Sequence, residues 1–319
     1  MQPITTSENR ETVSRERIKI AAMIDAHFPL PVHHPFDWTL IAGFLAPRCI
    51  PGVEAVSGLA YRRTIDLHGR HGTIELGPDA DGALGVTIRH PDAGSHPAIA
   101  ARLGRQFDLM TDIAAIQAQF GRDPLLASMV AARPGLRVPG AWDPFELAVR
   151  AILGQQVSVA AATTLAGRVA VAYGTPLQLD DGPPPDGLTQ VFPAPAALVA
   201  ADPGVLRIPT KRAETIAGLA RAALAEPALF EGRLPLDELV ARLDALPGIG
   251  PWTAHYIAMR ALREPDAFPS GDLGLRKAMV VAGVLPSFKE MDARAEAWRP
   301  WRAYAALHLW MSLGGGTGG

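Results

Sequence analysis

Apolar and polar positions alternate along the chain from about Tyr61 to His90. Two turn-forming clusters, HGRHG and PDADG, divide this region into three short runs. A period of two places successive side chains on opposite faces of a strand, so the pattern predicts a small antiparallel sheet. It is the one region that we predict to be β. The apolar positions that define the runs are Ile65, Leu67, Ile74, Leu76, Leu84, Val86 and Ile88.

Beyond about residue 98 the pattern changes to helices joined by short loops. Asp143 and Pro144 predict the start of a helix that ends at Gly154, because an aspartate N-cap and a first-turn proline both suit a helix N-terminus. Ser158 is expected to cap a second helix that stops near Gly174, with the turn GQQVS between the two. Residues 175–196 are rich in Pro, Gly and Asp and predict an excursion loop or a hinge. Further helices are predicted at 195–201, 211–225 and 236–245.

A tight glycine turn separates two helices near residue 248. Gly248 and Gly250 break the first helix, and Pro251 suits the first position of the second. The first amides of that second helix have no partner within it, and the glycines let another backbone approach, so the turn suits a phosphate. On these residues alone, an ordinary corner between two helices is the more common explanation. The apolar stripe of the first helix is formed by Leu236, Leu239, Val240, Leu243 and Leu246.

Composition limits the class of protein. The 319 residues suffice for two or three domains, and the single cysteine, Cys49, excludes an internal disulfide framework, a thiolate zinc site and a four-cysteine iron–sulfur cluster. The net charge of −2 argues against a protein that coats nucleic acid, so any nucleic-acid contact must be local. Residues 1–30 lack the pattern of a signal peptide, and no apolar run reaches the roughly 18 residues of a membrane span. We expect a cytoplasmic protein without a membrane partner.

The glycine turn belongs to a longer motif. LPGIG is followed by Asp272, which lies 22 residues after Gly250 within PSGDLGL. This combination resembles the helix–hairpin–helix, Gly/Pro-Asp superfamily of DNA glycosylases. The segments PFDWTLIAGFL, ARPGLRVPG, RAILGQQVSVA, WTAHY and WRPWRAYAALHLW resemble, in the same order, the DNA-3-methyladenine glycosylase II type of alkylation-repair enzyme. The resemblance covers about residues 35 to 313.

The resemblance implies an α+β, mostly α fold, in which a small antiparallel sheet subdomain precedes a two-lobed, all-helical helix–hairpin–helix core. We place the sheet subdomain at residues 36–140 and the helical domain at 141–313. Residues 1–35 are predicted to be a polar helical arm of unknown role, and residues 314–319 a flexible tail.

The resemblance also implies that Asp272 is the catalytic carboxylate. It would stabilise an oxocarbenium-like transition state or orient water. Asp272 also suits the N-cap of a helix over 273–279, and the two roles are compatible. In superfamily members that also cut the DNA backbone, a lysine two positions after the second hairpin glycine forms a Schiff base. Here that position holds Trp252, so hydrolysis without lyase activity is expected.

Aromatic residues are expected to hold the extruded base. Trp252 and Tyr256 are four residues apart and share a helix face, which a core stripe would also explain. The resemblance implies that they line a base pocket together with Trp310 and Phe44, where electron-rich rings stack on cationic alkylpurines. A purine alkylated at N3 or N7 leaves as a neutral base, so a single carboxylate is sufficient.

The remaining expected contacts are with the DNA backbone and with the gap that the flipped base leaves in the duplex. The amides of Gly248, Gly250 and Thr253 are candidates for phosphate binding. Gln155 and Gln156 match the loop that fills the gap, with Gln156 at the wedge position, although a plain helix-end turn is the alternative. Arg276 is expected either to contact the DNA backbone or to lie on a solvated face of its helix. By resemblance, a sodium or potassium ion is expected on the backbone carbonyls of Asp244, Leu246 and Ile249.

These expectations combine into one hypothesis. The chain is predicted to be a monomeric, monofunctional DNA glycosylase that flips and hydrolyses alkylated bases from double-stranded DNA, as in base excision repair, and that requires no cofactor. Two alternatives stay open. One is a glycosylase of the same fold acting on uracil, hypoxanthine or mismatched bases. The other is a catalytically silent protein that binds lesion-containing DNA.

Overall fold

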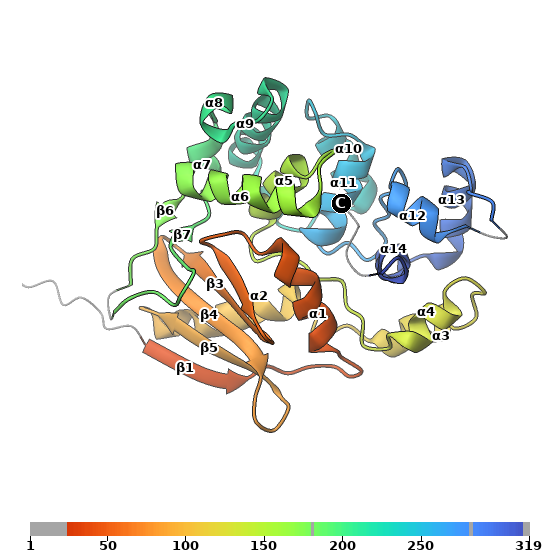
Figure 1. Cartoon of the computed structure of the whole chain (residues 1–319), viewed down its shortest axis with the longest axis horizontal. Coiled ribbons are helices and arrows are strands. Elements are labelled where there is room, and N and C mark those ends of the chain that lie inside the picture. The colour runs from red at the N-terminus through yellow and green to blue at the C-terminus, as the bar shows by residue number, and fades with distance from the viewer. Residues whose placement is uncertain (1–23, 180–181, 281–282, 315–319) are drawn as a thin grey trace, which may run out of the picture.

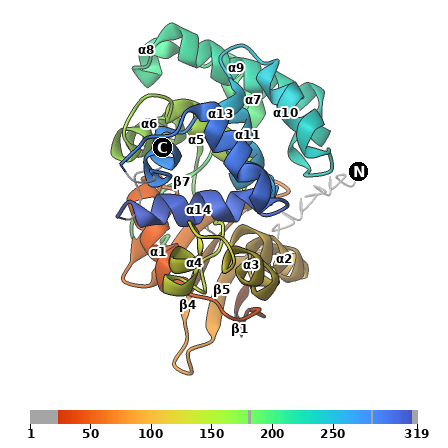
Figure 2. The same cartoon turned by 90° about the vertical axis from the view of Figure 1, so that its right-hand side faces the viewer.

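The structure, a computed structural model, describes residues 24–179, 182–280 and 283–314. A sheet subdomain lies below a larger helical part in Figure 1, and Figure 2 shows helix α14 crossing the middle of the molecule. The predicted fold class, α+β with mostly helices, is confirmed. None of the helices within the described ranges combines the length and apolarity that crossing a membrane requires.

The sheet has five strands in the order β1-β5-β4-β3-β2, and every neighbouring pair is antiparallel. The three predicted runs form β3, β4 and β5. His68 and Gly69, at φ 56° and 75°, make a two-residue turn between β3 and β4 that matches the twist of a hairpin. The strands are β1 (Ile24–Pro29), β2 (Glu54–Ser57), β3 (Ala60–Leu67), β4 (Arg70–Pro78) and β5 (Leu84–His90). Helices α1 (Trp38–Leu45) and α2 (His96–Gln106) share the core of this subdomain with the sheet.

Strand β1 corrects the prediction for the N-terminal arm. Residues 24–29 were expected in a polar helix, but they form an edge strand in which Phe28 pairs with Val86 of β5. Phe28 packs against the sheet core, and apolar and polar residues alternate from Ile24 to Phe28. The strand therefore has both a period-two pattern of its own and a pairing partner in β5. Residues 1–23 of the predicted arm, and the predicted tail from residue 315 onward, lie outside the described residues.

The helical part largely follows the predicted starts and caps. Asp143 accepts the amide of Glu146 at the start of α5, and Ser158 accepts the amide of Ala161 at the start of α6. The helix predicted at 195–201 ends early, because Asp202 caps a new short helix. The helices are α3 (Ile113–Phe120), α4 (Ala127–Ala132), α5 (Pro144–Leu153), α6 (Val159–Tyr173), α7 (Pro195–Leu198), α8 (Pro203–Leu206), α9 (Thr210–Ala225), α10 (Leu236–Asp244), α11 (Pro251–Arg260), α12 (Leu273–Ala278), α13 (Phe288–Ala295) and α14 (Arg302–Ser312), with short 3-10 helices η1 (Ala46–Arg48), η2 (Ala93–Ser95), η3 (Pro227–Phe230) and η4 (Glu296–Trp298).

The Pro- and Gly-rich excursion after α6 returns to the sheet subdomain. It contains two short paired strands, β6 (Thr175–Pro176) and β7 (Gln190–Val191), so the prediction of a single β region was too narrow. The amide of Gln190 donates to the carbonyl of Gly52 at 2.9 Å, and the Thr64 hydroxyl donates to the Gln190 carbonyl at 2.8 Å. The excursion therefore ties the helical part to the sheet.

Buried charges connect the sheet to α5. The Arg63 guanidinium on β3 donates to Glu146 on α5 at 2.7 Å, and Arg150 on α5 donates to Glu54 on β2 at 3.1 Å. Because these groups are enclosed, each charge needs its partner to offset the loss of water. The network holds α5, and with it the GQQVS turn, in a fixed position relative to the sheet subdomain.

Candidate active site

The turn between α10 and α11 requires glycine at Gly248 for two reasons. Gly248 has φ 88°, and a Cβ there would lie 2.0 Å from the hydroxyl oxygen of Thr215 on α9. Gly250 differs, because a Cβ at that position would meet open space. Gly250 is the N-cap of α11, and among the described residues no side chain caps that helix. Within the described ranges, the first amides of α11 therefore lack a side-chain partner.

Asp272 is buried, 7% exposed, at the N-terminus of α12. Its Oδ1 accepts the Leu275 amide at 2.7 Å and the indole N–H of Trp310 at 2.9 Å. Its Oδ2 accepts the indole N–H of Trp252 at 3.1 Å. The N-cap that the sequence predicted is therefore present, and two tryptophans from other helices fix the orientation of the same carboxylate.

The structure brings together three of the four rings that were predicted to line the base pocket. Trp252 and Tyr256 on α11 stack with centroids 5.2 Å apart and planes 13° apart. Tyr256 lies 6.3 Å from the ring of Trp310 on α14, at an angle of 58°. Both tryptophans also donate to Asp272. An aromatic surface and a fixed anion are thus built from the same side chains.

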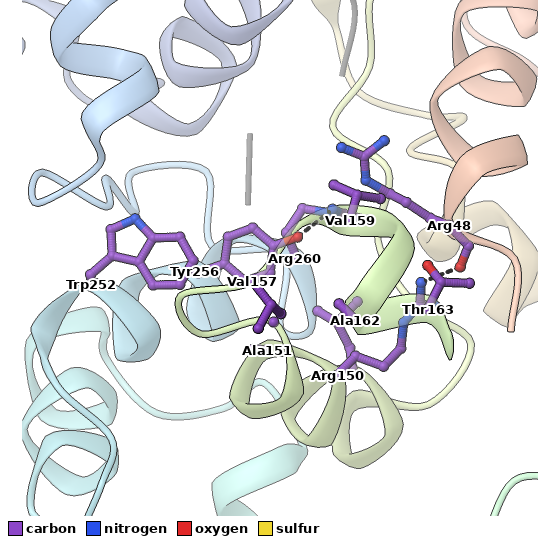
Figure 3. Close-up of a pocket in the computed structure, with 12 residues that line it drawn as sticks. Arg48, Arg150, Ala151, Val157, Val159, Ala162, Thr163, Trp252, Tyr256 and Arg260 are labelled. Atoms are coloured by element: carbon purple, nitrogen blue, oxygen red, sulfur yellow. Dashed lines mark hydrogen bonds between the residues drawn. The ribbon is translucent and has the colours of Figure 1, made fainter. Parts of the chain in front are cut away.

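A pocket opens beside Trp252 and Tyr256 (Figure 3). In this view the two rings lie side by side at one end, and Arg48 and Thr163 lie at the other. Asp272 does not line this pocket directly, but Trp252 contacts both the pocket and the carboxylate. The other lining residues come from α5, α6 and their connection, and they are Leu147, Arg150, Ala151, Gly154, Val157, Val159 and Ala162, with Arg260 from α11.

Arginines in this pocket were missed by the sequence prediction. Arg260 donates to the Tyr256 hydroxyl at 3.1 Å, and its guanidinium lies 4.7 Å from the ring of Phe44. The Arg48 guanidinium lies 3.9 Å from the centroid of the same Phe44 ring, and burial lowers the pKa of Arg48 to about 10. Phe44 was predicted to be a fourth ring of the pocket. It contacts two arginines, and both of these arginines line the pocket. Each arginine follows its aromatic partner by four residues, a spacing that could have indicated the contact.

The predicted DNA-contact residues fall into different surroundings. Gln156 is exposed with a φ of 57°, whereas the Gln155 amide bonds to the glycine turn. Thr253 is buried, and its hydroxyl oxygen accepts from Gln155 at 3.1 Å. Arg276 donates to the Pro286 carbonyl at 2.6 Å and lies over Phe288 at 5.0 Å, so its side chain is engaged within the chain. Its contact with DNA stays a prediction.

The cation site also stays a prediction. Among the carbonyls of Asp244, Leu246 and Ile249, that of Leu246 accepts the amide of Ile249 at 3.0 Å within the turn. A carbonyl oxygen has two lone pairs, so this bond leaves the Leu246 oxygen able to bind a cation as well. Three uncharged oxygens on one turn are a donor set that suits a monovalent ion.

His308, two residues before Trp310, provides a test of packing beneath the aromatic surface. It is buried, and burial together with Arg133 lowers its pKa to about 4, although a hydrogen bond to the Met129 backbone opposes the shift. Between the ordinary histidine pKa of about 6.5 and this value, the unfolded chain binds more protons at His308 than the folded chain does. The free energy of unfolding is therefore not reduced by His308 above about pH 6.5, and it falls as the pH drops from 6.5 towards 4.

Between pH 7 and pH 4.5 the free energy of unfolding, measured by urea denaturation, should fall by about 2–3 kcal/mol less when His308 is replaced with glutamine. Replacement of the exposed His33 with glutamine is the matched control for a histidine-to-glutamine change outside the core. A His308 variant with the wild-type slope would contradict the assignment of a buried, neutral imidazole.

Comparisons with known proteins agree with this architecture. A family model described as the AlkA N-terminal domain matches residues 27–143. The chain is 40% identical to the probable bifunctional transcriptional activator/DNA repair enzyme AlkA of Mycobacterium tuberculosis, over 89% of this chain and 56% of that protein, so it spans just over half the length of that relative. The solved 3-methyladenine DNA-glycosylase from Archaeoglobus fulgidus has the same fold, with a TM-score of 0.76 at 23% identity, covering 90% of this chain and 97% of that one.

A second relative matches along nearly its whole length. The chain is 39% identical to DNA-3-methyladenine glycosylase 2 of Escherichia coli, over 88% of this chain and 95% of that protein. This match includes the sheet subdomain, the glycine turn and the region that holds Asp272. The chain therefore belongs to the AlkA family, that of DNA-3-methyladenine glycosylase 2.

Proposed function

We propose that the protein is a DNA glycosylase that hydrolyses the N-glycosidic bond of alkylated purines, such as 3-methyladenine, in double-stranded DNA. The observation that carries this proposal is the pair of indole N–H groups, from Trp252 and Trp310, that hold the Asp272 carboxylate beside a stacked aromatic surface. The name of the E. coli relative supports the same substrate class. A base-stacking surface and an anion for the sugar are the two parts that this reaction needs.

The chemistry follows the movement of positive charge. A purine alkylated at N3 or N7 is cationic and is attracted to the faces of Trp252 and Tyr256. As the glycosidic bond breaks, the positive charge passes to the sugar and the base leaves neutral, so no proton donor is needed. The Asp272 carboxylate, held in one orientation by its indole donors, stabilises the developing charge on the sugar and orients the attacking water.

The glycine turn is proposed to hold a DNA phosphate. The α11 amides beyond Gly250 carry the partial positive charge of a helix N-terminus, and the open space at Gly250 admits a phosphate oxygen. A sodium or potassium ion on the carbonyls of Asp244, Leu246 and Ile249 would bind a further oxygen of the same phosphate. The turn thus fixes the register of the DNA, and base recognition is left to the aromatic pocket.

A comparison of released bases tests the proposed substrate class. Methylated duplex DNA and a uracil-containing duplex are incubated with the protein, and the free bases are separated and quantified. We expect release of 3-methyladenine, with uracil released at least about a hundredfold more slowly, since a neutral base gains less from stacking and leaves less readily. Absence of methylpurine release would reject this substrate class, and faster uracil release would favour the alternative glycosylase.

The absence of a lysine at Trp252 predicts hydrolysis without backbone cleavage. With borohydride present, the protein is expected to form no covalent adduct with DNA, because a Schiff base requires an amine at the sugar. The abasic strand should stay intact until alkali is added. A glycosylase that carries lysine at this position is the positive control, and a trapped adduct with the present protein would contradict the proposal.

A further inference from the structure

The two adjacent glutamines of the GQQVS turn have different environments. The Gln155 side chain is directed to the glycine turn, whereas Gln156 is exposed. We propose that Gln155 is a positioning residue, a strut that ties the loop carrying Gln156 to the phosphate-binding turn, so that Gln156 alone enters the gap left by the flipped base. This inference rests on the proposed function and gives Gln155 a role separate from that of Gln156 at the wedge position.

Both N–H groups of the Gln155 side-chain amide are hydrogen-bonded within the protein. Nε2 donates to the carbonyl of Gly248 at 2.9 Å and to the hydroxyl oxygen of Thr253 at 3.1 Å. A glutamine amide has two N–H donors, so both are engaged. The two acceptors lie 93 and 98 residues away along the chain, on either side of Gly250. Gln155 therefore spans the start of α11 and is not free to enter DNA.

Helix α9 closes the arrangement from a third side. Arg212 donates from its guanidinium to the backbone carbonyl of Gln155 at 2.7 Å. One helical turn later, Thr215 lies against Gly248, so closely that no Cβ would fit between them. The same helix thus contacts both the loop and the turn. The GQQVS loop, the glycine turn and α9 thus contact one another pairwise, so we expect the three to move together.

Gln156 shows the result of this arrangement. Its φ of 57° is in the left-handed region, which a residue with a side chain adopts only when its surroundings enforce it. The two neighbouring anchors, the Gln155 side chain and the Gln155 carbonyl, supply that constraint. An outward-facing amide can fill the gap in the stack and donate to or accept from the unpaired base opposite. Phosphate binding at the turn and gap filling at Gln156 are therefore mechanically linked.

The first experiment measures gap filling without bond cleavage. The DNA is a duplex with a tetrahydrofuran abasic-site mimic and 2-aminopurine beside the gap, and the signal is the fluorescence change on protein binding. Gln155→Met keeps the side-chain length but removes both donors. We expect Gln155→Met to lower the amplitude or the rate of the fluorescence signal at least tenfold. Gln156→Ala is expected to have the same effect. A Gln155→Met protein with the wild-type signal would overturn the strut.

A second variant covers the case in which Gln155→Met fails to fold. Arg212→Gln leaves Gln155 in place but removes the anchor on its carbonyl. It is expected to reduce the same signal, by a smaller factor. Wild-type behaviour of this variant would contradict the contribution of α9.

The second experiment measures base release from a lesion opposite a normal base and from the same lesion opposite a gap. The loss caused by Gln155→Met should be at least tenfold larger for the paired lesion, because only that lesion needs the gap filled. The double variant Gln155→Met/Gln156→Ala should be no slower than Gln156→Ala alone, since the strut acts through Gln156. Equal losses on both lesions, or additive losses, would overturn the strut.

The two experiments separate this inference from the proposed function. A wild-type protein that releases no base from either lesion would reject the proposed glycosylase activity. The fluorescence signal on the abasic-site mimic would still decide the strut, because it requires no cleavage.

Discussion

Replacement of Asp272 with asparagine is expected to lower the rate of base release by a factor on the order of 10³, the usual effect of removing one electrostatic contact to a transition state. Asparagine keeps the shape of the side chain and one oxygen for the Leu275 amide, so the N-cap of α12 is retained. What it loses is the negative charge that faces the developing cation. Binding of lesion-containing DNA should stay within about threefold of wild type, because the predicted phosphate contacts lie elsewhere.

The indole donors make this variant informative about geometry as well as charge. Because the asparagine oxygen stays with the Leu275 amide and the Trp310 indole, its NH₂ group faces the indole N–H of Trp252, which is also a donor. Trp310→Phe provides the comparison, because it removes one donor and keeps the charge, so it should slow release by about tenfold. Asp237→Asn, at an exposed position on α10, controls for a change in net charge.

Single-turnover base release and fluorescence anisotropy, with a thermal unfolding scan for each variant, check these expectations. An Asp272→Asn protein with wild-type activity would show that the catalytic assignment is wrong. If the wild type itself binds lesions but releases no base, the protein is a silent lesion-binding protein.

Replacement of Gly248 with alanine is expected to destabilise the protein by about 3 kcal/mol or more and to abolish DNA binding. The added Cβ would have an unfavourable φ of 88° and would overlap Thr215. Gly250→Ala is the matched variant, because a Cβ there meets open space within the protein. It should keep its stability to within about 1 kcal/mol, yet bind DNA about tenfold more weakly, since the methyl group obstructs the phosphate.

Urea denaturation and anisotropy with an abasic-site duplex separate the two effects. Adding Thr215→Ala to Gly248→Ala should recover part of the stability, because it removes the overlapping hydroxyl but not the backbone strain. If Gly250→Ala bound DNA as tightly as wild type, the turn would not be the phosphate site.

The parts of the fold that were predictable from sequence are those set by local chemistry. Asp143, Ser158 and Pro251 mark helix starts through capping and backbone preference, and the structure has helices at all three. The central strands were predictable because one face of each is apolar. Strand β1 was missed although its residues alternate, because the run is only six residues long and follows a segment rich in charged residues that was predicted to be helical.

The candidate site divides in the same way. Asp272 and its aromatic neighbours were expected from the resemblance to the glycosylase family, and the structure places them together. The strut at Gln155 could not be predicted, since its partners lie more than 90 residues away along the chain. The buried arginines were missed because a charged side chain is expected at the surface unless its partners are known.

The role of Asp272 is tested most directly by a crystal structure of the protein with duplex DNA that carries a cationic pyrrolidine abasic-site mimic. We expect the pyrrolidine nitrogen within about 4 Å of the Asp272 carboxylate, a phosphate at the amides after Gly250, and Gln156 in the gap. A pyrrolidine ring bound away from Asp272, with no phosphate at the glycine turn, would contradict this expectation.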